Sequence, residues 1–235
     1  MREQIRQAVA VLTAGGVIAH PTETVFGLAA DPTNRHALDR LLALKGRQPN
    51  KGLILLIPDR SVLNEFLQPR TLIDPGVQAL MDRFWPGPLT LVLPARPGLP
   101  APLTGGGDFI AVRHSPSPLV ADLLAVWGAP LVSTSANFSG QPVLNDHQAV
   151  LAAFGAQVGV VIAGCCSASA QPSTVVIMDP DRGRMQLLRS GEIALAVIRG
   201  VLMDQGLFQA EDRRNGGETH RQSSGYHLYS GDRDV

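Results

Sequence analysis

The sequence predicts an α/β fold built around a largely parallel or mixed sheet. Segments with apolar residues at helical spacing alternate along the chain with short apolar runs that are typical of strands. The run at residues 53–57 is wholly apolar between Gly52 and Pro58, as expected for a strand that is covered on both faces. The 24 glycines and 18 prolines exceed average usage. Many of them lie in loops next to strand ends, where open α/β sheets bind ligands.

The first half of the chain shows this alternation most clearly. Apolar residues at helical spacing predict helices over residues 4–14, which Gly15 ends, and over residues 34–44. A third helix is expected over residues 77–84, before the turn Trp85-Pro86-Gly87-Pro88. Short apolar runs predict strands over residues 17–20, 53–57 and 89–93. The polar segment 21–24 is expected to be a loop.

The second half continues the pattern up to residue 203. We expect strands over residues 109–113, 131–132, 158–163, 174–178 and 185–189, and helices over residues 119–127, 147–154 and 192–203. The three glycines 105–107 are expected to form the turn between strands 89–93 and 109–113, and residues 133–137 a loop after a short strand.

The end of the chain has a different composition. Residues 204–235 include only 7 hydrophobic side chains and 10 charged ones, with a net charge of −2. Such a segment cannot bury enough apolar surface to fold by itself, so we expect a disordered or loosely attached tail. The predicted organisation is one domain over residues 1–203 followed by this tail over residues 204–235.

Charge and cysteine content exclude several classes of protein. Twenty basic and twenty acidic residues give a net charge of zero, which argues against a dedicated nucleic-acid binder but leaves room for a small basic pocket. No apolar run approaches the length of about 20 residues that spans a bilayer, and no signal peptide is recognisable. The cysteines, Cys165 and Cys166, are adjacent, so neither a disulfide framework nor a zinc site is expected. We expect a cytoplasmic protein.

Four loop segments concentrate hydroxyls, amides and cations. They are residues 21–24, 45–51, 133–137 and 172–174. The second of them holds both lysines of the chain, Lys45 and Lys51, whereas the other basic residues are arginines. Two of these arginines, Arg113 and Arg189, each end a predicted strand. Cations neutralise anionic groups and hydroxyls orient their oxygens, so this set predicts an enzyme that binds phosphates and a carboxylate. The common phosphate-loop, dinucleotide and nucleophile-elbow motifs are absent.

Seven segments show a family resemblance. In chain order they are PTETVFGL (21–28), KGRQPNKGLILLI (45–57), FWPGPLTLVLPA (84–95), AVRHSPSPLV (111–120), LVSTSANFSGQP (131–142), PSTVV (172–176) and LLRSGEI (187–193). Together they closely resemble the YrdC-like family, the threonylcarbamoyl-adenylate synthases, and within it the short bacterial type. The resemblance implies a single domain with a twisted open mixed sheet, flanking helices and a concave ligand-binding face.

The resemblance also implies a reaction. L-threonine, bicarbonate and ATP would give threonylcarbamoyl-AMP and diphosphate, with Mg²⁺ accompanying ATP and no metal ligands from the protein. A threonylcarbamoyl transferase complex would then modify an adenosine of tRNA beside the anticodon. The implied contacts are these small molecules, the downstream complex and a weak RNA contact, with no membrane.

Site residues follow from the matching motifs. The resemblance assigns catalysis to Lys45 and Arg47, which would neutralise triphosphate and carbamate. It assigns threonine binding to Thr22, Thr24, Arg113, Ser133 and Ser173. It assigns ATP binding to Arg47, Lys51, Thr90, Ser135, Asn137 and Arg189. As a cation at a helix end, Lys45 is expected to contribute little to folding.

Each assignment has a structural alternative. Lys45 and Arg47 are also cations at the end of a predicted helix, where they would complement its dipole. The threonines 22 and 24 would serve equally as turn residues, and Ser135 with Asn137 as a cap of the next element. Glu23 is a candidate general base or an ordinary loop carboxylate. Histidines 20 and 114 are expected to be structural, and Trp85 is expected to pack in the core.

The chain departs from the family pattern at two positions. Phe26 stands where many members have tyrosine, so any role of that hydroxyl is lost. Lys51-Gly52 stands where many longer members have Asn-Pro. Two rival functions remain open: a non-catalytic RNA-binding maturation factor, and a carbamoyl-transfer domain of the hydrogenase-maturation type. The latter normally accompanies cysteine-rich zinc modules, which two cysteines cannot supply.

Overall fold

The computed structural model describes residues 1–46, 50–166, 171–207 and 227–228. Within these ranges the strands form one ten-stranded sheet in the order β10-β9-β8-β4-β5-β3-β6-β2-β1-β7. The strands are β1 (Ile18–His20), β2 (Gly27–Ala30), β3 (Ile54–Leu56), β4 (Leu89–Pro94), β5 (Phe109–Arg113), β6 (Leu131–Ser135), β7 (Val160–Val161), β8 (Thr174–Asp179), β9 (Arg184–Arg189) and β10 (His227–Leu228). Parallel pairs such as β3–β5 and β4–β8 occur beside antiparallel pairs such as β2–β6 and β4–β5, so the expected mixed sheet is confirmed.

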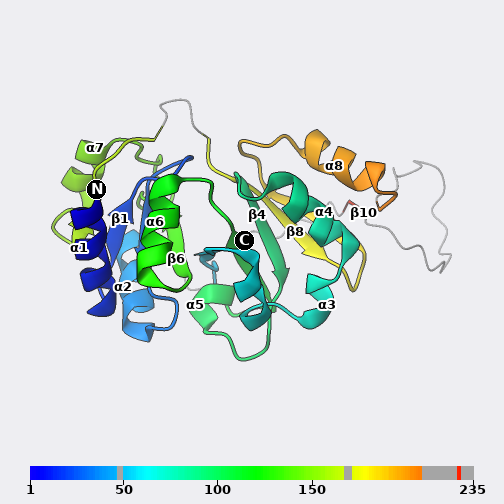
Figure 1. Ribbon diagram of the computed structural model, residues 1–235, viewed down its shortest axis with the longest axis horizontal. Helices are drawn as coiled ribbons and strands as arrows, with labels where there is room; N and C mark the ends of the chain where they lie inside the picture. The colour runs from blue at the N-terminus through cyan, green and yellow to red at the C-terminus, as the bar shows by residue number, and fades with distance from the viewer. Residues whose placement is uncertain (47–49, 167–170, 208–226, 229–235) are drawn as a thin grey trace.

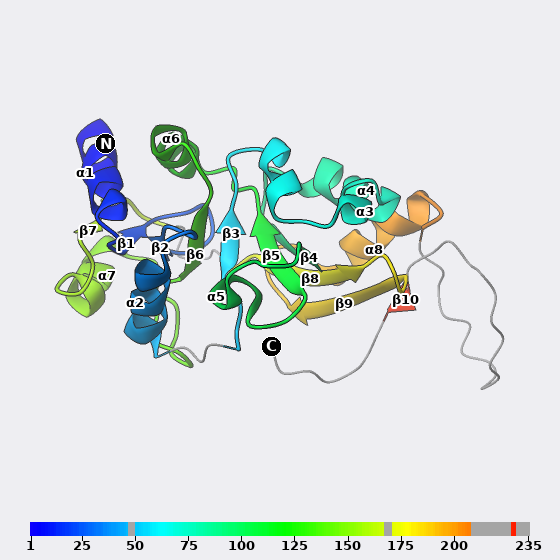
Figure 2. The same cartoon turned by 90° about the horizontal axis from the view of Figure 1, so that it is seen from below.

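Helices flank the sheet on both faces (Figures 1 and 2). They are α1 (Arg2–Thr13), α2 (Arg35–Lys45), the 3₁₀ helix η1 (Arg60–Glu65), α3 (Pro69–Leu72), α4 (Pro75–Phe84), α5 (Ala101–Thr104), α6 (Pro118–Trp127), α7 (His147–Phe154) and α8 (Leu195–Asp204). Figure 2 shows α1 and α6 on one side of β1, β2 and β6, and α2 and α7 on the other. No helix in the described part of the chain is long and apolar enough to cross a bilayer.

The apolar faces of these helices account for the covered sheet. Ile5 and Leu12 of α1 pack with Val120 and Leu124 of α6 in one cluster against the sheet. The opposite cluster is larger and includes the apolar side of α2, whose spacing the sequence shows, together with residues of α4 and α7. β3 is covered on both sides by these clusters, because Leu55 belongs to one and Leu56 to the other. The interpretation of residues 53–57 as a doubly covered strand is therefore confirmed.

Several elements differ from the sequence prediction, among them η1 and α3, for which the sequence predicted no helix. β2 (Gly27–Ala30) was not expected, since its small side chains lack the β-branched pattern typical of strands; all four of its residues are buried. β6 continues to Ser135 because Ser133 to Ser135 pair with β2, so this segment is a strand and not a loop. α5 lies between β4 and β5 and ends at Gly105, whose φ of 65° is left-handed, so the three glycines are not a simple hairpin turn.

The predicted tail falls mostly outside the described residues, which exclude 208–226 and 229–235. α8 extends to Asp204, one residue beyond the predicted domain boundary. Residues 227–228 form β10, which pairs in parallel with β9 at the edge of the sheet. This short pairing is compatible with a loosely attached tail, and the domain boundary at residue 203 stays a prediction.

Candidate active site

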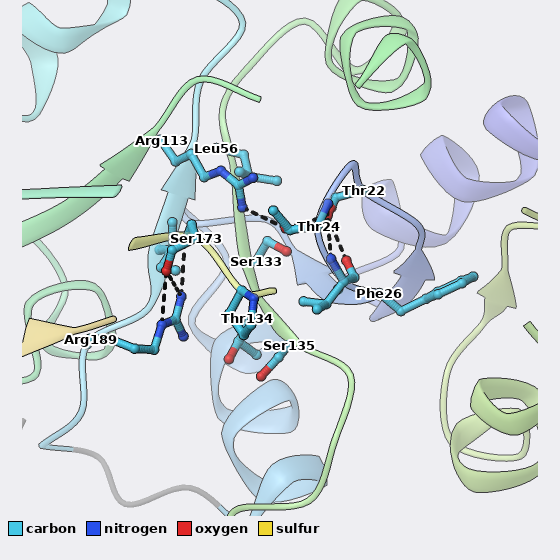
Figure 3. Close-up of a pocket in the computed structure, with 15 residues that line it drawn as sticks. Thr22, Thr24, Phe26, Leu56, Arg113, Ser133, Thr134, Ser135, Ser173 and Arg189 are labelled. Carbon is cyan, nitrogen blue, oxygen red and sulfur yellow. Dashed lines mark hydrogen bonds between the residues drawn. The ribbon is translucent and has the colours of Figure 1, made fainter. Parts of the chain in front are cut away.

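A pocket opens where β2, β3, β5 and β6 meet the loop before β8. It is lined by Thr22, Thr24, Val25, Phe26, Gly27, Gly52, Ile54, Leu56, Arg113, Ser133, Thr134, Ser135, Pro172, Ser173 and Arg189. Figure 3 shows Ser133, Thr134 and Ser135 between the turn at Thr22–Phe26 and the pair Ser173 and Arg189. All five predicted threonine-binding residues and two of the predicted ATP-binding residues therefore line one pocket, which fulfils the expectation of a concave site.

Strand register explains why these distant residues meet. Across β3, Ile54 pairs with Ser133 of β6 and Leu56 pairs with Arg113 of β5. Ile54 and Leu56 are two residues apart and so face the same side of the sheet. The same register places Ser135 opposite Gly27 of β2. Hydrogen bonding within the sheet thus brings the polar strand residues Arg113, Ser133 and Ser135 to one face.

The most buried charge in the pocket is Arg113, whose side chain is 7% exposed. Its Nη2 forms an ion pair with Glu23, its Nη1 donates to Thr24 Oγ1 at 3.2 Å, and its Nε donates to the Gly87 carbonyl at 3.3 Å. Burial lowers the pKa of Arg113, and the charge of Glu23 opposes that shift. An arginine stays charged under such a shift. Three of its five N–H groups are engaged by described residues, which leaves donors for an anionic ligand.

Glu23 is held on both carboxylate oxygens. Oε1 accepts from Arg113, and Oε2 accepts from the Ser115 hydroxyl at 2.6 Å. A carboxylate fixed in this way serves to orient the arginine, so the geometry favours the structural interpretation of Glu23 over the general base. Ser115 was not singled out from the sequence, although it lies within the matching segment 111–120.

The two threonines have different surroundings. Thr22 Oγ1 donates to the Val25 carbonyl at 2.7 Å and accepts the amide N–H groups of Thr24 and Val25, each at 3.1 Å. The Thr22 hydroxyl therefore builds the turn, which matches the structural alternative for this residue. Thr24 Oγ1 instead accepts from Arg113 and connects the turn to the buried charge.

The opposite wall is built around Ser173. Its hydroxyl lies 2.8 Å from Thr90 Oγ1 and accepts from Arg189 Nη2 at 3.0 Å, while its carbonyl accepts from Arg189 Nε at 3.1 Å. Thr90 is fully buried and does not line the pocket, so the geometry favours a role in positioning Ser173. Its predicted contact with ATP stays a prediction. Gly191 packs closely against the backbone of this loop, and a Cβ at this position would lie 2.2 Å from the Pro172 carbonyl oxygen.

Lys45 joins two of the predicted motifs. It is the last residue of α2 and is 3% exposed. Its Nζ donates to the Ser135 carbonyl and to Asn137 Oδ1, the latter at 2.9 Å, and the Ser135 hydroxyl donates to Asn137 Oδ1 at 2.6 Å. Lys45 thus lies directly behind Ser135, which lines the pocket, whereas Lys45 and Asn137 themselves do not. The expectation that it contributes little to folding stays a prediction, and the burial of Lys45 and its hydrogen bonds to the 135–137 turn argue for a larger contribution.

Two predicted cations are not found among the residues that line the pocket. Arg47 lies outside the described residues. Lys51 is partly buried but does not line the pocket, although its neighbour Gly52 does. Phe26 is fully buried and also contributes to the core. Trp85 packs in the same core with its indole N–H donating to the Leu89 carbonyl at 2.7 Å, as expected.

His20, His114 and Cys166 lie next to residues that line the pocket. Burial lowers the pKa of His114, whose side chain is not part of the pocket. His20 is fully buried, with Nε2 3.3 Å from Ser133 Oγ, a contact that no sequence motif indicated. Both cysteines are free thiols, and burial raises the pKa of Cys166.

The fold and the pocket define an α/β domain with a hydroxyl-lined pocket that holds a buried arginine. Residues 10–191 match the model of the Sua5/YciO/YrdC family, which is described as "Telomere recombination". The chain belongs to this family. It is similar to a threonylcarbamoyl-AMP synthase of Vibrio cholerae, with 41% identity over 189 residues that cover 80% of this chain and 98% of the relative.

Solved structures agree with this assignment. The crystal structure of P. abyssi Sua5 complexed with L-threonine has a TM-score of 0.79 and 32% sequence identity, and the match covers 86% of this chain. This chain spans only 58% of that protein. E. coli YciO has a TM-score of 0.73 over 83% of this chain and 92% of its own, and at 24% identity it shows the shared fold alone.

Proposed function

We propose that this protein is a threonylcarbamoyl-AMP synthase, an enzyme that converts L-threonine, bicarbonate and ATP to threonylcarbamoyl-AMP and diphosphate. One observation carries the proposal: a single pocket joins the buried Arg113 and a row of hydroxyls that ends at Ser135. Behind this wall, Lys45 Nζ and the Ser135 hydroxyl both donate to Asn137 Oδ1. The names of the similar proteins support it.

The chemistry requires positioning more than a covalent nucleophile. The threonine amine takes up carbon dioxide derived from bicarbonate and becomes a carbamate. A carbamate oxygen then attacks the α-phosphorus of ATP, and diphosphate leaves. Holding the two reactants in line and neutralising their charges supplies most of the rate enhancement in such a transfer.

The pocket offers groups for both substrates. The free N–H donors of Arg113 suit the threonine carboxylate, since guanidinium groups bind carboxylates through paired hydrogen bonds. Thr24, Ser133 and Ser173 surround the rest of the amino acid, and Thr22 shapes their turn.

The triphosphate belongs at the rim of the same pocket. The charges of Lys45 and Arg47 neutralise triphosphate and carbamate. Ser135, Asn137, Lys51 and Arg189 orient ATP, and Thr90 acts through Ser173.

Mg²⁺ is proposed to arrive with ATP and to offset phosphate charge, held by phosphate oxygens and water. Among the described residues no group of three or more His, Cys, Asp or Glu side chains is arranged to hold a metal ion, so no protein ligand is assigned. The product would pass in the cytoplasm to a threonylcarbamoyl transferase complex that acts on tRNA beside the anticodon, with only weak RNA contact by this chain.

The decisive experiment follows diphosphate release with ATP, Mg²⁺, bicarbonate and either L-threonine or L-serine. We expect release that depends on both L-threonine and bicarbonate. Absence of release, together with RNA binding that weakens steeply with salt, would instead favour the RNA-binding maturation factor. Turnover that needs a preformed carbamoyl donor in place of threonine and bicarbonate would favour the carbamoyl-transfer function.

A further inference from the structure

A buried histidine supports the pocket from behind. His20 ends β1 and is fully buried. Its Nδ1 lies 3.3 Å from the Pro21 carbonyl oxygen, and its Nε2 lies 3.3 Å from Ser133 Oγ on β6. The two side chains meet over Gly27 of β2, where a Cβ would lie 2.5 Å from Ser133 Oγ and 3.0 Å from His20 Nε2. Glycine at this position therefore makes room for the His20–Ser133 hydrogen bond.

The surroundings of the ring determine where its proton lies. A carbonyl oxygen only accepts hydrogen bonds, so Nδ1 carries the hydrogen and donates to Pro21. Burial lowers the pKa of His20 to about 4, so the ring is neutral near pH 7. Of the nearby charges, Glu23 raises this pKa and Arg113 lowers it, and these two are paired with each other. A neutral ring with its hydrogen on Nδ1 has a bare Nε2, which must accept the Ser133 hydroxyl hydrogen.

We propose that His20 is a positioning residue. Its Nε2 accepts the hydrogen of the Ser133 hydroxyl, so only the acceptor lone pairs of Ser133 Oγ face the pocket. Ser133 then binds an N–H or O–H group of a ligand and repels carboxylate or phosphate oxygens. Arg113, across β3 on the same face of the sheet, has donors only and the opposite preference. The pocket thus distinguishes the two ends of an amino acid, with the carboxylate at Arg113 and the amine at Ser133. This inference rests on the proposed function and assigns the orientation of its substrate.

Two substitutions of similar chemistry separate the contacts of His20. The His20→Asn variant keeps an amide nitrogen near the position of Nδ1, so it can still donate to Pro21, but leaves nothing to accept from Ser133. The His20→Gln variant can place its amide oxygen near the position of Nε2, where it accepts from Ser133. His114→Phe serves as the control, because His114 is a partly buried histidine outside the pocket.

The readouts are the apparent KM values for L-threonine and for ATP in diphosphate release, together with Tm. We expect H20N to raise KM for threonine about tenfold, the usual scale for losing one polar interaction, while KM for ATP changes less than about twofold. H20Q should recover most of this loss, and H114F should leave both constants unchanged. Because His20 acts through Ser133, the double variant H20N/S133A should bind threonine no worse than S133A alone.

Other outcomes overturn the inference. Independent, additive effects of H20N and S133A would show that His20 does not act through Ser133. Equal increases of KM for threonine and ATP in H20N, or no rescue by H20Q at an unchanged Tm, would show a general structural role. If the wild-type protein releases diphosphate without needing threonine, the proposed function fails and the inference fails with it. A normal wild-type dependence with additive variants contradicts the inference alone.

Discussion

Replacing Lys45 by alanine tests the site most directly, because this residue is buried and holds Ser135, which lines the pocket. Its ammonium group holds the Ser135 carbonyl and Asn137 Oδ1, so its loss should disorder the turn that carries the Ser-x-Asn motif. We expect Lys45→Ala to lower both the free energy of unfolding and the turnover number. Lys45→Arg should rescue turnover poorly, because a planar guanidinium cannot replace a compact ammonium in a buried site.

The size of both effects can be worked out from the contacts. Hydrogen bonds from a charged group contribute about 1.5–3 kcal/mol net. Ser135 Oγ still donates to Asn137 Oδ1 in the variant, so the total loss should remain near 2–3 kcal/mol. In a protein of this size each kcal/mol shifts Tm by about 2–4 °C, which predicts a decrease of about 4–12 °C. Loss of one preorganised cation next to developing charge should lower kcat by about 10²–10³-fold.

The assay is diphosphate release at saturating L-threonine, bicarbonate and ATP, at a temperature well below the Tm of the variant, alongside a melting curve. Arg40→Ala is the matched control, because Arg40 lies on the exposed side of the same helix α2. It should retain wild-type Tm and turnover. Near-normal kcat in Lys45→Ala would refute the catalytic assignment, and an unchanged Tm would refute the argument from burial.

Three further outcomes are expected. Ser173→Ala should raise KM for L-threonine about tenfold, and by more than it raises KM for ATP. Thr90→Val should have a weaker effect of the same kind, because Ser173 keeps its hydrogen bond to Arg189. A change in KM for ATP alone would contradict both expectations. The pKa of His20, about 4 when folded against 6.5 in the reference state, makes the unfolded chain bind the extra proton as pH falls from 6.5 to 4. The free energy of unfolding, measured in urea, should therefore have its full value above pH 6.5 and be about 2 kcal/mol lower at pH 5. His20→Gln should reduce this loss. Deleting residues 208–235, which removes the short β9–β10 pairing, should lower the free energy of unfolding by less than about 1 kcal/mol. A larger loss in urea denaturation would show that the segment contributes more to the domain than this pairing.

Local pattern predicted most of the secondary structure. Helices α1, α2, α4, α6 and α7 follow from apolar spacing with clear ends, and β4 and β5 from apolar runs between turn residues. The sequence did not predict β2 or the second half of β6, because Gly-Leu-Ala-Ala and Ser-Thr-Ser lack the residues typical of strands. They are strands because each pairs with the other, and such pairing is a property of the folded sheet.

The sequence by itself determined the fold class and the set of candidate polar groups, because helical spacing, apolar runs and contiguous motifs are local features. Only the tertiary structure decided what each group does. It placed Thr90 behind Ser173 and buried Lys45 against Ser135. It paired both carboxylate oxygens of Glu23, one with Arg113 and one with Ser115. It also brought His20 to Ser133 across 113 positions of the chain. Burial and hydrogen-bond geometry depend on strand register and on neighbours distant in sequence, and these determine whether a polar side chain binds a ligand or supports one that does.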